Sequence, residues 1–327
     1  MSSQEWGTAN TSMEYKRLGN TDLDISEIML GTAELGMDYG FRNTDQYTKP
    51  DRRLAIAIIH RAIDLGITWL DTARSYGASE EIIGHALNQL TTRVHISSKI
   101  AVSENLLGIQ HANILRGEIK RSINTSLQAL RREAVDLMQL HNASLAILSC
   151  EEVMRALEDA QQEGKVRFLG VSCYEEDVAL AALKLGSFQA LQMPFNILDR
   201  KIIARVLPGA VERGIGVVAR SVFLRGVLTE NINSLPDSLR RVREAALPAL
   251  YEFTGKVHSL SELALRFALS FNELASVVIG VRSMRELESN MANYARGRLS
   301  PDQVQRLLQL SVVEPSLLDT KNWVNFI

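Results

Sequence analysis

The chain has 327 residues, of which 46% are hydrophobic and 23% charged, with 20 glycines and 7 prolines. This composition is typical of a folded globular protein and excludes a disordered or collagen-like chain. The net charge is -2, so there is no basic excess to neutralise nucleic-acid phosphates, and two cysteines are too few for a disulfide scaffold or a four-cysteine zinc site.

Short apolar segments rich in β-branched residues recur along the chain and are bounded by glycine or polar residues. Segments of this kind are typical of buried strands. The sequence predicts eight of them, at residues 28–31, 67–71, 94–99, 135–141, 166–172, 190–192, 215–221 and 276–280.

Longer amphipathic segments lie between these strands and predict helices. The first begins at Asp51, a suitable cap, and ends before Gly66. The helices are expected at residues 51–65, from 79 onward, and at 113–131, 151–163, 175–185, 200–213, 260–269 and 283–293. Eight strands alternating with eight helices predict an α/β fold, the (β/α)8 TIM barrel. Periodicity alone leaves a doubly wound open sheet as the alternative.

Three features fall outside this alternation. Residues 15–25, with a turn sequence at 19–22, predict an N-terminal β-hairpin that caps the bottom of the barrel. Two extra helices are expected near residues 237–253 and 301–310. Residues 319–327, with Trp323 and Phe326, form a tail suited to folding over the barrel mouth. No linker divides the chain, which predicts a single barrel domain over residues 1–327.

Polar and ionisable residues stand at the ends of the predicted strands. They are Asp71, Lys99, His141, Ser172, Gln192 and Ser221, and Tyr76 follows closely behind the second strand. In a (β/α)8 barrel the carboxyl ends of the strands carry the active site. Asp71, Lys99 and His141 follow consecutive strands, so their side chains are expected to point at one volume.

These residues lie in segments that resemble the aldo-keto reductase family over nearly the whole chain. Residues 70–80, Leu-Asp-Thr-Ala-Arg-Ser-Tyr-Gly-Ala-Ser-Glu, resemble the family signature in which the Asp and the Tyr stand five residues apart. The lysine, histidine, Gly-Val-Ser and Gln-x-x-x-Asn segments of the family resemble Ser98-Lys99, Leu140-His141-Asn142, Gly170-Val171-Ser172, and Gln192 with Asn196. Residues 30–36 and 220–224 are similar to a bacterial subgroup often associated with sugar-related pathways.

The resemblance implies an NAD(P)-dependent oxidoreductase that transfers a hydride between nicotinamide and a carbonyl/alcohol pair. Tyr76 would be the general acid in reduction and the base in oxidation. A free tyrosine has a pKa of ~10, and a nearby Lys99 is expected to lower it. Asp71 would anchor the lysine, and His141, as a neutral imidazole, would hold the substrate oxygen against the tyrosine hydroxyl. No metal site is expected.

The cofactor is expected beyond the eighth strand rather than at residues 214–219. That stretch, Gly-Ile-Gly-Val-Val-Ala, enters a strand, whereas a Rossmann fingerprint follows one. Gly280 ends the eighth strand and Ser283 is a predicted helix cap, the usual phosphate position in such barrels.

The resemblance implies that the segment ending in Asn290 binds the adenosine 2′-phosphate, with Arg282 pairing with it and Ser283 donating a hydrogen bond. Glu286 stands beside the expected adenine ribose, where a carboxylate repels a phosphate or accepts from a hydroxyl. Because Arg282 and Arg285 still supply positive charge, NADP(H) is favoured over NAD(H).

At the other end of the cofactor, the resemblance implies contacts from Gly31, Thr32, Ser172, Gln192, Arg220, Ser221, Phe223, Arg225 and Gly226. Ser172 and Gln192 would bind the carboxamide. Cys173 stands where the family usually has asparagine, and Arg220 where many relatives have a tyrosine that stacks on the nicotinamide. Arg220 is expected either to disfavour the oxidised cofactor or to reach an anionic substrate group. A salt bridge directed away from the site is the structural alternative.

The substrate walls are expected from loops 34–47, 101–112 and 223–234 and the tail near Trp323, which suit a small aldehyde, ketone or sugar. Two other functions remain open: a nucleotide-binding accessory or regulatory protein of the same fold, and a barrel lyase that uses Lys99 as a Schiff base. No apolar run reaches the ~18–20 residues of a membrane span, and the N-terminus lacks a secretion signal. A cytoplasmic monomer or weak homo-oligomer is therefore expected.

Overall fold

The computed structural model describes residues 12–39, 48–88, 90–310, 314–320 and 323. Eight strands form a closed barrel in the order β10-β3-β4-β5-β6-β7-β8-β9. They are β3 (Ile28–Gly31), β4 (Trp69–Asp71), β5 (His95–Ile100), β6 (Val135–His141), β7 (Val166–Ser172), β8 (Ala190–Pro194), β9 (Gly216–Arg220) and β10 (Leu274–Gly280). β10 pairs in parallel with β3, with Ile279 opposite Leu30. This closure confirms the predicted barrel and excludes the open sheet.

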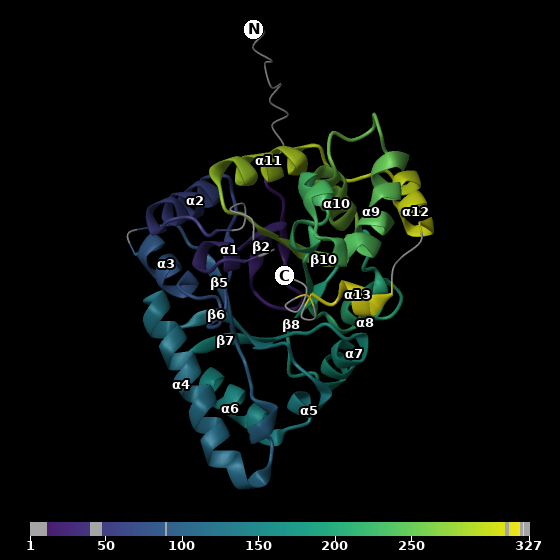
Figure 1. The fold of residues 1–327 in the computed structure, drawn as a ribbon. Coiled ribbons are helices and arrows are strands. Elements are labelled where there is room, and N and C mark those ends of the chain that lie inside the picture. The colour runs from purple at the N-terminus through teal and green to yellow at the C-terminus, as the bar shows by residue number, and fades with distance from the viewer. Residues whose placement is uncertain (1–11, 40–47, 89, 311–313, 321–322, 324–327) are drawn as a thin grey trace.

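A ring of helices surrounds the barrel (Figure 1). The helices that follow successive strands are α2 (Arg52–Asp64), α3 (Ser79–Ala86), α4 (Ala112–Leu130), α6 (Glu151–Gln162), α7 (Glu176–Leu185), α8 (Val206–Arg213), α10 (Leu260–Leu269) and α11 (Met284–Ala295). Asp51 caps α2 by accepting a hydrogen bond from the Leu54 amide at 2.8 Å. The apolar faces of these helices and the outward-facing strand residues form one continuous core.

The two extra helices are confirmed as α9 (Arg240–Glu252) and α12 (Pro301–Gln309). The helix expected from residue 200 is shorter, because residues Lys201–Ile203 form the 3₁₀ turn η4 and α8 begins only at Val206. Arg200 donates hydrogen bonds to the carbonyls of Leu307 and Leu310 at the end of α12. These contacts hold the segment before α8 against the end of α12. The short helices α1 (Ala33–Gly36), α5 (Leu145–Leu148) and α13 (Pro315–Leu318) were not predicted.

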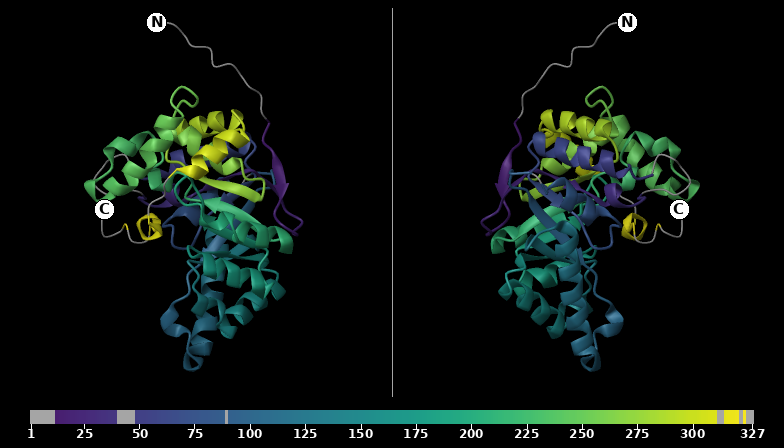
Figure 2. Two further views of the ribbon diagram at one scale, coloured as in Figure 1. Left: turned by 90° about the vertical axis from the view of Figure 1, so that its right-hand side faces the viewer. Right: turned by 90° about the vertical axis from the view of Figure 1, so that its left-hand side faces the viewer.

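The predicted hairpin closes the N-terminal end of the barrel. It consists of β1 (Tyr15–Arg17) and β2 (Asp24–Ser26), which pair antiparallel. The Asn20 amide donates to the Gly214 carbonyl at 2.7 Å, just before β9. Leu18, Leu23 and Ile25 pack into a core cluster with residues from inside the barrel. Figure 2 shows the hairpin and α13 at opposite ends of the barrel, so the carboxyl ends of the strands form the open end.

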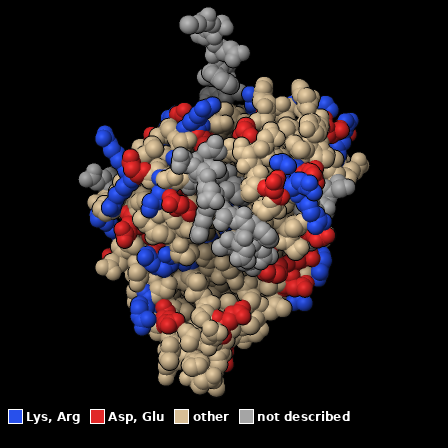
Figure 3. Space-filling view, in the orientation of Figure 1, with Lys and Arg blue, Asp and Glu red and all other residues tan. Residues whose placement is uncertain are grey.

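The C-terminal segment lies at this open end. The Thr320 hydroxyl is 3.3 Å from the hydroxyl of Tyr174, and Trp323 is buried and donates to the Leu317 carbonyl at 2.9 Å. The expected tail over the mouth is thus found for these residues, while Phe326 lies outside the described part of the chain. Acidic and basic side chains are interspersed over the face in Figure 3. No helix of the described residues has the length and hydropathy needed to cross a bilayer.

Candidate active site

A cavity of about 1370 Å³ opens at the carboxyl ends of the strands. Pockets for drug-sized ligands hold roughly 300–1,000 Å³, so this cavity has room for a dinucleotide together with a small substrate. Every residue that the sequence assigned to the cofactor lines it: Gly31, Thr32, Ser172, Gln192, Arg220, Ser221, Phe223, Arg225, Gly226, Gly280, Arg282, Ser283, Glu286 and Asn290. Asp71, Tyr76 and His141 line it as well, and Lys99 lies behind Asp71.

The buried pair Asp71 and Lys99 forms the base of the site. Lys99 Nζ lies 2.6 Å from Asp71 Oδ2 and donates to the Thr72 carbonyl at 3.0 Å. Asp71 Oδ1 accepts hydrogen bonds from the Ser97 hydroxyl at 2.8 Å and from Gln192 Nε2 at 2.9 Å. Burial lowers the pKa of Lys99, and Asp71 opposes this shift. The two side chains are therefore held as one hydrogen-bonded unit.

The turn that carries Tyr76 is fixed by backbone contacts to α1. The Tyr76 amide donates to the Ala73 carbonyl at 3.0 Å, and the Ala78 amide donates to the Gly36 carbonyl at 3.1 Å. A Cβ atom on Gly36 would lie 2.2 Å from the Tyr76 carbonyl oxygen. Position 36 therefore needs glycine, because only a residue without a side chain lets the two backbones approach this closely.

The structure brings the predicted catalytic side chains together. Lys99 Nζ is 5.0 Å from the ring centre of Tyr76. The rings of Tyr76 and His141 meet edge to face with centres 5.7 Å apart, and the Ser75 hydroxyl lies 3.3 Å from His141 Nδ1. A phenol and an imidazole thus face the same part of the cavity, with the ion pair beneath them.

The expected lowering of the Tyr76 pKa is wrong. Burial raises the pKa of this phenol and Asp71 raises it further, while the cation that opposes the rise most is Arg220 rather than Lys99. The charge of Lys99 is largely compensated by Asp71, 2.6 Å away, which explains why the lysine does not dominate. Tyr76 accordingly keeps its proton.

Burial, with Lys99 and Arg220 nearby, lowers the pKa of His141 to about 3, so the imidazole is neutral as predicted. An unfolded histidine binds a proton near pH 6.5, whereas the folded one binds it only near pH 3. We therefore expect the free energy of unfolding to decrease as the pH is lowered from about 6.5 to about 3. This residue contributes up to about 1.4 kcal/mol per pH unit to the decrease. Urea unfolding between pH 7.5 and pH 4 checks this, and an unchanged pH dependence in His141→Gln would contradict it.

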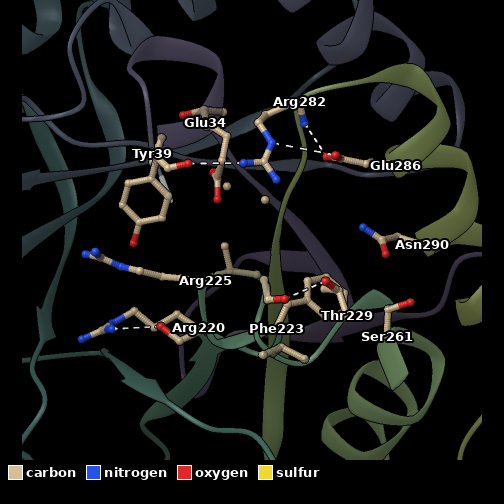
Figure 4. A pocket seen from close by; sticks show the side chains of 18 of the residues that line it. Glu34, Tyr39, Arg220, Phe223, Arg225, Thr229, Ser261, Arg282, Glu286 and Asn290 are labelled. Carbon is tan, nitrogen blue, oxygen red and sulfur yellow. Dashed lines mark hydrogen bonds and ion pairs between the residues drawn. The ribbon is translucent and has the colours of Figure 1, made fainter. Parts of the chain in front are cut away.

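A carboxylate already occupies the N-terminus of α11. Ser283 accepts a hydrogen bond from the Glu286 amide at 3.2 Å, and Glu286 Oε2 accepts one from the Arg282 amide at 2.7 Å. Glu286 Oε1 is also 3.8 Å from Arg282 Nε, and Arg282 Nη1 donates to the Tyr39 carbonyl at 3.3 Å (Figure 4). The expected phosphate site therefore contains a cation that is partly neutralised by Glu286.

Glu34 is a site residue that the sequence analysis treated only as part of a loop. It lines the cavity, and burial raises its pKa to about 7 while Arg282 opposes the shift. A Cβ atom on Gly280 would lie 2.2 Å from a Glu34 carboxylate oxygen. Glu34 stands shortly after Gly31, the last residue of the first barrel strand, and this position near a strand end could have identified it as a site residue.

Tyr174 is a second cavity residue that the sequence analysis missed, although it follows the strand end at Ser172 by two positions. The guanidinium carbon of Arg220 lies 4.0 Å from its ring centre. Arg220 donates to the Cys173 carbonyl at 3.2 Å and to the Ser221 hydroxyl at 3.3 Å. The alternative of a salt bridge directed away from the site is therefore wrong for the described residues.

Loop 101–112 was expected to form a substrate wall, and this expectation is wrong, because none of its described residues lines the cavity. Asn196, which ends the Gln-x-x-x-Asn segment, holds the loop after β9. It donates to the Ser221 carbonyl at 3.0 Å and accepts from the Leu198 and Asp199 amides, each at 2.9 Å. Phe41 of the first loop is outside the described residues.

The comparisons with known proteins agree with this geometry. The uncharacterized oxidoreductase YqkF of Bacillus subtilis is 28% identical over 90% of this chain and 95% of its own, and the L-galactose dehydrogenase of Arabidopsis thaliana is 27% identical over 86% and 88%. The holo form of the aldo-keto reductase AKR11C1 from Bacillus halodurans superposes with a TM-score of 0.74, at 26% identity over 92% of this chain and 98% of that one.

The sequence profile of the Aldo/keto reductase family matches residues 27–311, which is nearly all of the barrel. The match includes the strand ends that carry Asp71, Lys99 and His141 and the turn that carries Tyr76. The chain belongs to the aldo/keto reductase family and is an oxidoreductase that acts on carbonyl compounds.

Proposed function

We propose that this protein reduces small aldehydes, ketones or sugars with a nicotinamide cofactor, and that Tyr76 supplies the proton to the carbonyl oxygen. The observation that carries the proposal is the contact between the Tyr76 and His141 rings, 5.7 Å apart, above the Asp71–Lys99 pair. Sugars are included among the proposed substrates because the chain is similar to the L-galactose dehydrogenase.

Each catalytic side chain has a task that follows from its environment. Tyr76 holds a proton at its hydroxyl, because burial disfavours the phenolate. Neutral His141 donates a hydrogen bond to the carbonyl oxygen and so orients it towards this hydroxyl. When alkoxide character develops on the substrate, the hydroxyl proton moves to it. The nearby cations Arg220 and Lys99 favour the phenolate that remains, with Arg220 contributing most.

The cavity fits a nicotinamide dinucleotide, which supplies the hydride when bound. The Nε atom of Arg225 is buried and has no hydrogen-bond partner among the described residues, which suits a phosphate oxygen. Gly226 adopts a φ of 95°, a conformation that favours glycine and lets the backbone approach a ligand closely. Ser172 and Gln192 are the proposed carboxamide partners, with Gly31 and Thr32 beside them on the wall.

We infer a preference for NADP(H), because Arg282 and Arg285 both line the adenosine end, whereas Glu286 limits that preference. Glu286→Gln should strengthen NADPH binding relative to NADH binding by roughly three- to tenfold, or about 0.7–1.4 kcal/mol, since it removes a like charge at the 2′-phosphate. Fluorescence titration of both reduced cofactors measures the ratio.

A matched control lies on the same helix. Glu288 is 3.6 Å from Arg61, and Glu288→Gln removes one carboxylate from α11 without altering the Ser283 cap. This variant should leave the NADPH to NADH ratio within twofold. An equal change in both variants would show that net charge, rather than the position of Glu286, sets the preference.

The proposed function is tested by titrating NADPH, NADP, NADH and NAD and then assaying a carbonyl and sugar panel with the tightest cofactor. Cofactor binding without turnover of any panel member would favour the accessory-protein alternative. Borohydride trapping of a substrate on Lys99 without nicotinamide would favour the Schiff-base lyase. Lys99 is only 1% exposed and bonded to Asp71, which disfavours the lyase.

A further inference from the structure

Arg220 brings a positive charge to the catalytic end of the cavity. Its hydrogen-bond partners are the Cys173 carbonyl, the Ser221 hydroxyl and the Tyr174 side chain, none of which is a carboxylate. In the part of the chain that the structure describes, its guanidinium forms no ion pair with a carboxylate; it stacks instead on the ring of Tyr174 at 4.0 Å. A half-buried cation with this environment lacks a compensating anion.

Two other cations of this region are paired with carboxylates. Lys99 is paired with Asp71 at 2.6 Å, and Arg282 lies 3.8 Å from Glu286. Figure 4 shows the guanidinium groups of Arg220 and Arg225 directed to the side of the cavity away from Arg282 and Glu286. The described residues thus leave an excess of positive charge on this side.

The charge of Arg220 acts on the catalytic residues directly. It contributes to lowering the pKa of His141, after burial and Lys99, and it opposes the rise in the pKa of Tyr76. It also helps to hold the pKa of Tyr174 below its ordinary value against the effect of burial. Arg220, Tyr76 and His141 line the same cavity, so an anion held by Arg220 would share that cavity with a carbonyl placed between Tyr76 and His141.

We propose that Arg220 binds a carboxylate or phosphate group of the substrate, so that the preferred substrates are small aldehydes or ketones with an anionic group a few bonds from the carbonyl. A guanidinium has five N–H donors in a planar fork that matches such anions. Its protein partners are the Cys173 carbonyl, the Ser221 hydroxyl and the Tyr174 side chain, which leaves donors of the fork for a ligand. Stacking on Tyr174 fixes the plane of the fork. This inference rests on the proposed reductase function.

The test compares substrates that differ only in the anionic group. Succinic semialdehyde is paired with butanal, and D-glyceraldehyde 3-phosphate with D-glyceraldehyde, in the wild type, Arg220→Gln, Arg220→Lys and the control Arg155→Gln, which changes an exposed arginine of α6 outside the cavity. The wild type should prefer the anionic member of at least one pair in kcat/KM by roughly 30-fold or more, and Arg220→Gln should remove most of this preference through a higher KM. Arg220→Lys should retain part of it, and Arg155→Gln all of it.

Each result decides the proposal. The pair that shows the preference identifies carboxylate or phosphate as the bound group. A preference that is absent in the wild type, or unchanged in Arg220→Gln, overturns the inference, and so does an equal loss for both members of a pair, which would assign Arg220 to the cofactor.

A direct binding measurement separates this inference from the proposed function. If no aldehyde is turned over, the proposed function fails, and calorimetry with 4-hydroxybutanoate and glycerol 3-phosphate then decides the role of Arg220. Binding of either anion that is at least tenfold weaker in Arg220→Gln supports the inference. Equal binding by both proteins, or no binding by either, overturns it.

Discussion

Tyr76→Phe should lower kcat by about 10²–10⁴-fold, the usual contribution of a positioned general acid. The substitution removes the hydroxyl that carries the transferable proton and keeps the ring that meets His141 edge to face. The fold and the cofactor site should remain intact, because the turn is held by backbone hydrogen bonds and by the contact with Gly36. Steady-state kinetics at saturating cofactor measures the effect.

A control separates lost chemistry from lost binding. The affinity of Tyr76→Phe for the reduced cofactor should stay within twofold of that of the wild type, while Ser75→Ala, which alters the neighbour of His141 Nδ1, should lower kcat by less than tenfold. Retention of more than a tenth of the activity in Tyr76→Phe would contradict its assignment as the proton donor.

Asp71→Asn should lower the free energy of unfolding by about 3–5 kcal/mol, because it leaves the buried Lys99 ammonium without its charge partner. Asp71 is 4% exposed and Lys99 1%, so water cannot replace the lost contact. Activity should also be lost, since Asp71 accepts hydrogen bonds from both Lys99 and Gln192. Urea unfolding followed by tryptophan fluorescence measures the stability.

The double variant Asp71→Asn with Lys99→Met provides the decisive comparison. Removing both charges should recover most of the stability, since replacing a whole buried ion pair is often nearly neutral, whereas activity should stay absent. A double variant in which the two single losses simply add would show that the pair is not coupled in the folded protein.

Local patterns predicted the elements of the fold, but periodicity alone left a closed barrel and an open sheet as alternatives. The short apolar segments ended at glycine or polar residues, and this alternation predicted all eight barrel strands, the hairpin and both extra helices. Element ends were less accurate, as with the helix expected from residue 200, because the contact of Arg200 with α12 joins residues more than a hundred positions apart. Such a contact leaves no periodic signal in its own segment.

The strand-end positions of Asp71, Lys99 and His141, and of Tyr76 in the turn after Asp71, follow from local sequence patterns. Closure of a parallel barrel brings successive strand ends to one rim, so these residues were expected to meet. How these groups are charged depends on the tertiary structure. Burial sets the pKa of Tyr76 and Glu34, and the pairing of Glu286 with Arg282 and the stacking of Arg220 on Tyr174 depend on side chains from different segments. Burial and charge pairing are properties of distance in space, which a local pattern along the chain does not contain.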